Sequence, residues 1–203
     1  MKLQTLDDTA KELLRFRGNV RGEVVLNHFE YIKGKEGKGG AKKLEEKLRD
    51  VGVSLDFNKI KPLDWVSEGV SALTVVASKE IFFWENKDIF EMGRVAPHLS
   101  FALKMLAQNF VDPKRLFEES PIYWNNLFDF GSLVPVSFSE SSKKGILQIK
   151  EYKTHPLLCV YHAGYIQGIT EFALKSKKVS VKEIKCVYKG SDYDEYEFSW
   201  SDN

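Results

Sequence analysis

The sequence changes character after Gly131, and this change constrains the fold more than any single motif does. Four short runs with alternating apolar and polar side chains flank one long helix-like segment; the runs are residues 132–140, 146–152, 179–190 and 193–200, and the segment is 156–175. Strands that follow one another along a chain usually pair. We therefore predict an α+β protein with a β-β-α-β-β antiparallel four-stranded sheet, one face of which is covered by helices.

The first two thirds of the chain carry the spacing of amphipathic helices. We expect helices within residues 6–18, 21–37, 39–52 and 61–84, then two helices within 86–110 that break near Pro97. A further helix begins at Asp112, a suitable N-cap, with Pro113 at its first position, and Pro121 kinks or splits it. We predict a single domain, 1–203, with a helical subregion at 1–130 and a sheet subregion at 131–203.

Composition excludes several classes of protein. The net charge is +1, which gives no overall attraction to nucleic acid, and two cysteines cannot form a disulfide framework or a four-cysteine zinc site. The N-terminus lacks the apolar core of a signal peptide, and no window reaches the roughly 18 apolar residues that a membrane span needs. We predict a soluble, cytoplasmic protein that binds no nucleic acid.

Small residues and a cysteine mark the C-terminal region. Gly164 and Gly168 lie in the predicted helix, Cys186 and Gly190 end the third strand, and Glu195-Tyr196 lie in the last strand. This pattern resembles the 4-vinyl-reductase-type small-molecule-binding domain. That domain is related to the haem nitric-oxide-binding (H-NOX) fold and to the Bet-type subunits of the transport protein particle. The segments "PLDWVSEGVSAL" and "YWNNLFDFG" resemble a bacterial branch found in myxobacteria, and the resemblance covers about residues 20 to 200.

The sequence departs from these relatives at the positions that carry cofactors. Members with the 4-vinyl-reductase signature often have a further cysteine in the last hairpin, where this chain has Asp194. Haem-binding relatives have a histidine on the helix before the sheet and a Tyr-x-Ser-x-Arg motif; here the helix reads "SPIYWNNLFDFG", and the motif reads Tyr152-Lys153-Thr154-His155-Pro156. His155 replaces the arginine that would clamp a propionate. We therefore predict no haem and no other cofactor.

The resemblance implies an apolar pocket between helices and sheet. We expect its lining to include Phe117, Tyr123, Trp124, Phe128, Tyr152, His155, Cys159 and His162. The aromatic residues could equally be plain core, because pockets and cores are both mainly apolar. Cys159 and Cys186 could be two small buried apolar residues of the core. Alternatively they could form a redox pair, or bind a metal ion with the help of His155 or His162. We predict no metal site. Gly164 and Gly168 indicate close approach to the sheet, another helix or a second subunit.

Known catalytic motifs are missing from the sequence, so we predict that the protein is not an enzyme. The main hypothesis is a sensor or ligand-binding domain that takes a small apolar ligand and signals to a partner protein. The alternative is a scaffold or dimerisation module without a ligand, which would form a homodimer or hold a signalling protein. A haem-based gas sensor is a third hypothesis.

Overall fold

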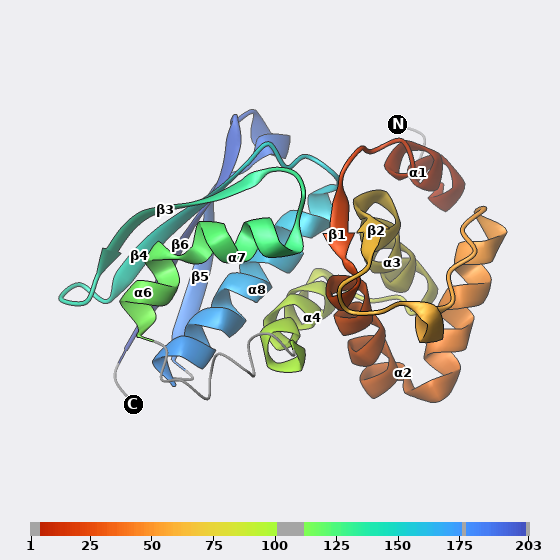
Figure 1. Cartoon of the computed structure of the whole chain (residues 1–203), viewed down its shortest axis with the longest axis horizontal. Coiled ribbons are helices and arrows are strands. Elements are labelled where there is room, and N and C mark those ends of the chain that lie inside the picture. The colour runs from red at the N-terminus through yellow and green to blue at the C-terminus, as the bar shows by residue number, and fades with distance from the viewer. Residues whose placement is uncertain (1–4, 101–111, 176–177, 202–203) are drawn as a thin grey trace.

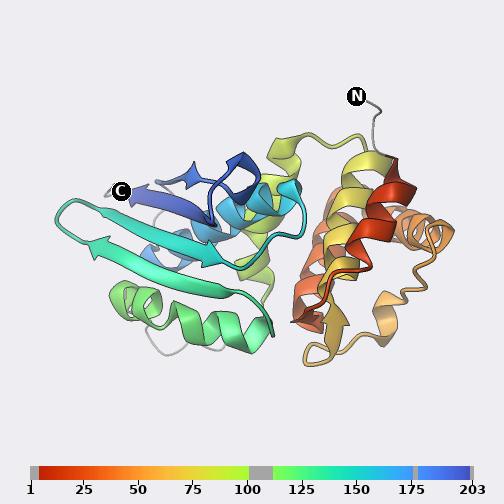
Figure 2. The ribbon, with the colours of Figure 1, turned by 90° about the horizontal axis from the view of Figure 1, so that it is seen from above.

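The computed structural model describes residues 5–100, 112–175 and 178–201. Figures 1 and 2 show two lobes side by side. We call residues 5–81 the helical lobe; it contains α1 (Leu6–Leu13), β1 (Asn19–Arg21), α2 (Gly22–Asp50), η1 (Phe57–Lys59), β2 (Trp65–Ser67) and α3 (Glu68–Ile81). The strands β1 and β2 form an antiparallel ribbon in which Val20 pairs with Val66. The two helices predicted at 21–37 and 39–52 are the two halves of α2, which meet at Gly37, where the backbone leaves helical geometry with φ 74° and ψ −177°.

The described residues from Asn86 onward form the sheet lobe. Its elements are α4 (Asn86–Leu99), α6 (Pro113–Glu118), α7 (Ser120–Leu127), β3 (Ser132–Ser139), β4 (Lys144–Lys150), α8 (Pro156–Leu174), β5 (Val179–Lys185), η2 (Val187–Lys189) and β6 (Tyr193–Trp200). The four strands pair antiparallel in the order β3-β4-β6-β5. The prediction of an α+β protein with a four-stranded antiparallel sheet is confirmed.

One face of this sheet is covered by helices. Ile149 on β4 and Tyr196 and Phe198 on β6 point to that face and are buried. Phe117 of α6 packs against Phe198, and the Tyr196 hydroxyl donates to the backbone oxygen of Cys159 on α8 over 3.1 Å. Polar pairs occupy the other face, as in the 2.6 Å hydrogen bond from Gln148 to Glu195. This alternation sets the register, because a slip of one residue would expose the apolar side.

The glycines of α8 allow close packing against α4. A Cβ atom at Gly164 would clash with the backbone oxygen of Phe90, and one at Gly168 with that of Arg94. Gly93 on α4 meets the backbone of Tyr161 in the same way. The sequence left the sheet, another helix or a second subunit as possible neighbours of Gly164 and Gly168, and the described structure places another helix there. Glycine is required here because any side chain would push the two backbones apart.

Two prolines lie at or near irregularities of the secondary structure. The helix α4 continues through Pro97 and ends at Leu99, so the predicted break lies slightly later, and the second helix expected there falls mainly on 101–111, outside the described residues. Pro135 lies on edge strand β3 beside a register shift between Pro135 and Ser137, as a residue without an amide donor requires. None of the described helices is long and apolar enough to cross a bilayer.

Candidate functional sites

A cavity of about 140 Å³ lies where the two lobes meet. Its wall is built by the first turns of α2, by α6, α7 and α8, and by the covered face of the sheet. Leu133, Leu147 and Ile149 supply the sheet side, and Val24 supplies the helical lobe. Most of the wall is apolar, and the described lining residues include no lysine or arginine. A cavity of this size can hold a single aromatic ring.

Aromatic side chains form the wall on the α6 and α7 side. Phe117, Tyr123, Trp124 and Phe128 all line the cavity. Trp124 stacks on Phe128 with ring centroids 4.2 Å apart, and its indole N–H donates to the backbone oxygen of Phe130 over 3.0 Å. The hydrogen bond satisfies the only polar group of the indole, which leaves its face free for apolar contact. These four residues are half of the set predicted for the pocket.

The imidazole of His162 is the notable polar group of the wall. It lies on α8, its side chain is buried, and its Nδ1 atom has no hydrogen-bond partner among the described residues. Burial lowers the pKa of His162 to about 3, so the ring is neutral at physiological pH. An unpaired buried nitrogen costs free energy unless a ligand or water meets it. A neutral imidazole in this position can ligate a metal ion or bond a ligand.

The other three predicted pocket residues do not appear in the cavity wall. Tyr152 packs behind His162, with ring centroids 4.6 Å apart, and its hydroxyl donates to Glu68 Oε1. His155 is the N-cap of α8 and accepts a 3.2 Å hydrogen bond from the amide of Leu157. Cys159 turns toward the β5–β6 corner. The pocket as a binding site stays a prediction.

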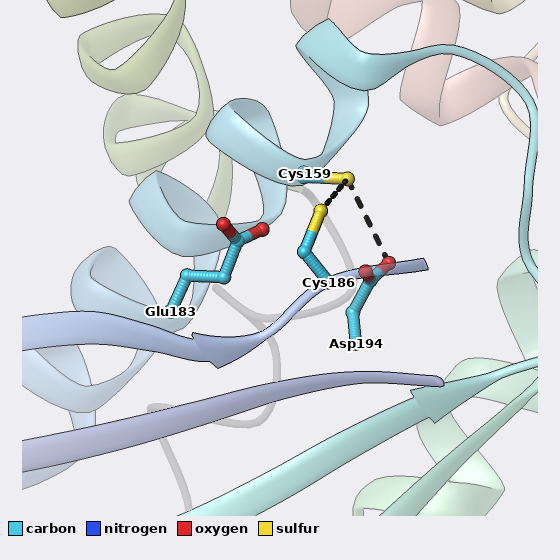
Figure 3. A group of neighbouring side chains, drawn as sticks. All are labelled: Cys159, Glu183, Cys186 and Asp194. Atoms are coloured by element: carbon cyan, nitrogen blue, oxygen red, sulfur yellow. Dashed lines mark hydrogen bonds between the residues drawn. The ribbon is translucent and has the colours of Figure 1, made fainter. Parts of the chain in front are cut away.

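At that corner, four potential metal ligands come together (Figure 3). The ligand atoms of Cys159, Glu183, Cys186 and Asp194 all lie within 4.8 Å of one another. The two Sγ atoms are 4.0 Å apart, and Cys159 Sγ lies 3.7 Å from Asp194 Oδ2. Asp194 also accepts a 2.8 Å hydrogen bond from the amide of Val187. We call these four residues the thiol–carboxylate cluster.

The electrostatics of the cluster favour protons or a cation. Burial, reinforced by the neighbouring Asp194, raises the pKa of the Cys159 thiol, and burial raises the pKa values of Cys186 and Asp194. Glu183 Oε1 is buried without a hydrogen-bond partner in the described part of the chain, whereas its Oε2 bonds Lys189 over 2.7 Å. A divalent cation would neutralise these groups and satisfy the unpaired oxygen.

Glu183 is a member that the sequence did not reveal. In a regular strand, residues 183 and 186 point to opposite faces, because side chains alternate. A register shift between Glu183 and Lys185 breaks the alternation in β5, and Cys186 follows the end of the strand. The signal in the sequence was only the spacing of an acidic residue three positions before Cys186.

Solved structures of H-NOX proteins share this fold. One is an H-NOX protein from S. oneidensis in the Fe(II)NO ligation state, with 12% identity and a TM-score of 0.68, covering 90% of this chain and 99% of the other. Another is an oxygen-binding H-NOX domain related to soluble guanylate cyclases, with 13% identity and a TM-score of 0.64, covering 90% and 95%. At this identity the likeness shows the H-NOX fold alone. No family model matches the sequence, and no curated protein matches it significantly.

The prediction that the chain binds no haem is contradicted by these comparisons. A third similar structure, with 13% identity and a TM-score of 0.63 over 89% of this chain and 99% of the other, is described as modulating haem redox potential through porphyrin distortion. The prediction was wrong because it tested only two motif positions, the helix before the sheet and residues 152–156. His162 reaches the cavity from α8, which neither motif includes.

Proposed function

We propose that this chain is a sensor domain that binds a flat, apolar ligand in the cavity and signals its presence to a partner protein. The similar structures favour haem as that ligand, with a small gas as the signal. The observation that carries the proposal is His162, a neutral imidazole on the wall of an apolar cavity, whose buried Nδ1 atom has no hydrogen-bond partner among the described residues. The resemblance to 4-vinyl-reductase-type domains stays part of the proposal, since it also implies ligand binding.

The described residues fit part of a haem group. His162 would hold the iron, and the rings of Trp124 and Phe128 would contact the macrocycle. When bound, the iron would supply a coordination position for a diatomic gas. The carboxylates of haem find no lysine or arginine in the described wall. A macrocycle is also larger than a single ring, so the cavity of about 140 Å³ would have to widen to hold it.

Titration of the purified protein with hemin tests this function. We expect the wild type to convert the broad band of free hemin into a sharp, red-shifted Soret band, and His162→Leu, which removes the proposed iron ligand, to leave the spectrum of free hemin. The control is His98→Gln, because His98 is exposed and outside the described cavity wall. A wild type that leaves the absorption spectrum of free hemin unchanged would overturn the haem assignment. Native mass spectrometry with a panel of smaller aromatic compounds then decides whether the cavity binds any ligand.

A second candidate function is a metal centre at the thiol–carboxylate cluster. The unpaired Glu183 Oε1 beside two thiols and Asp194 favours it. Thiolates and carboxylates in a four-ligand set suit zinc, and all four ligands come from the protein, as in sites that stabilise a fold. Such a centre would cross-link the first turn of α8 to the corner between β5 and β6 and so stabilise the fold.

Zinc content after loading and dialysis tests the metal centre. We expect stoichiometric zinc in the wild type and about tenfold or more loss of affinity in Asp194→Asn, which keeps the shape but loses one anionic ligand. Glu197→Gln, on the opposite face of β6, should bind zinc like the wild type. Equal zinc content in wild type and Asp194→Asn would contradict the assignment.

A further inference from the structure

Tyr152 touches the cavity wall and the helical lobe at the same time. Its ring packs edge-on against His162, and it also contacts Trp124 at a centroid distance of 5.8 Å. Both neighbours line the cavity. Its hydroxyl leaves this aromatic group and donates to Glu68 Oε1. One buried side chain therefore spans the boundary between the lobes that Figure 2 shows.

Glu68 is placed to transmit this contact to the backbone of the helical lobe. It is the first residue of α3, and its side chain is buried. Its amide donates to the backbone oxygen of Gly18 over 2.9 Å, just before β1. Burial raises the pKa of Glu68 to about 8, against the smaller opposing effect of the Tyr152 bond, so the carboxyl group is protonated at neutral pH.

We propose that the Glu68–Tyr152 pair is the contact by which the helical lobe positions His162 at the cavity wall. This inference rests on the proposed function, because it concerns the same ligand. A ligand that displaces His162 or Trp124 must move the Tyr152 ring, since packed interiors leave no slack. The movement then reaches Glu68 and the start of α3. Glu68 and Tyr152 are positioning residues and do not touch the ligand.

The other contacts between the lobes offer a matched control. The Tyr31 hydroxyl on α2 donates to the backbone oxygen of Asp88 on α4 over 3.3 Å. This bond also joins the two lobes through a tyrosine hydroxyl, but neither residue lines the described cavity. Tyr31→Phe therefore also removes one hydroxyl hydrogen bond between the lobes, but at a place that does not contact the described residues around His162.

The first arm of the test needs no ligand. In Tyr152→Phe the ring stays and only the hydroxyl is lost, so we expect shifted His162 imidazole resonances and about fivefold faster exchange of the Glu68 amide. Glu68→Leu should act like Tyr152→Phe. Glu68→Gln keeps an acceptor for the hydroxyl and resembles the protonated acid, so it should behave as the wild type. Unchanged His162 resonances in Tyr152→Phe, or the same shift in Tyr31→Phe, would overturn the inference.

The second arm measures hemin affinity. We expect hemin to bind Tyr152→Phe about fivefold more weakly than the wild type, and to bind Glu68→Gln with the same affinity as the wild type. Equal affinity for wild type and Tyr152→Phe overturns the positioning role and leaves the proposed function intact. If hemin fails to bind the wild type, the haem function fails, and the first arm alone decides whether the pair positions His162.

Discussion

The Glu68 carboxyl group makes the stability of the protein depend on pH. Its pKa is raised from an ordinary 4.5 to about 8 by burial. Below pH 4.5 the folded and unfolded chains both hold the proton, and the stability connected with this group is fully present. As pH rises from 4.5 to 8, the unfolded chain releases the proton first, and folding loses about 1.4 kcal/mol per pH unit.

Glu68→Gln should remove this loss, because the amide stays neutral at every pH. We expect wild type and variant to have similar free energies of unfolding near pH 4.5, and the variant to be more stable by a few kcal/mol, about 3–5, at pH 8. Urea unfolding at pH 5, 6.5 and 8 measures the difference. The lowered pKa values of His28 and His162 affect both proteins and cancel. Parallel pH curves would contradict the prediction, and Glu118→Gln, an exposed control, should give them.

Helices and strands differ in how far the sequence predicted them. The alternation of apolar and polar side chains predicted strands where β4 and β6 lie, and the structure shows that Ile149 and Tyr196 are on their buried face. The ribbon of β1 and β2 was not predicted, because three residues are too few to show a period. The glycines of α8 indicated a close contact, but only the tertiary structure shows that the neighbour is α4.

The candidate sites were less predictable than the fold, for a reason visible in single elements. The aromatic wall of α6 and α7 could be expected, because large apolar residues before the sheet must pack against it. Glu68 reads in the sequence as an ordinary acidic residue at the start of a helix. Its burial depends on Tyr152, which is 84 positions away along the chain. Local patterns carry no information about such a partner.

Considered as a whole, the molecule is two lobes with the cavity at their junction, so the attachment of the lobes controls the cavity. Asp129, in the segment after α7, holds the β1–β2 ribbon of the helical lobe. Its carboxylate accepts one hydrogen bond from the backbone N–H of Asn19 over 2.6 Å and another from the side-chain amide of Asn19 over 2.7 Å. The neighbouring residues Val20 and Phe128 form an antiparallel β-bridge. Phe128 itself lines the cavity.

Asp129→Ala should therefore loosen the lobes before either of them unfolds. We expect a loss of about 1–2 kcal/mol in the free energy of unfolding, because two hydrogen bonds to an exposed carboxylate disappear. Amide exchange should accelerate in β1 (Asn19–Arg21) and stay unchanged in β6 (Tyr193–Trp200), which belongs to the sheet lobe. The control Asp192→Ala, in the exposed turn before β6, should alter neither strand. Equal acceleration in β1 and β6 would show instead that the molecule opens as one cooperative unit, and cavity access would then require global unfolding.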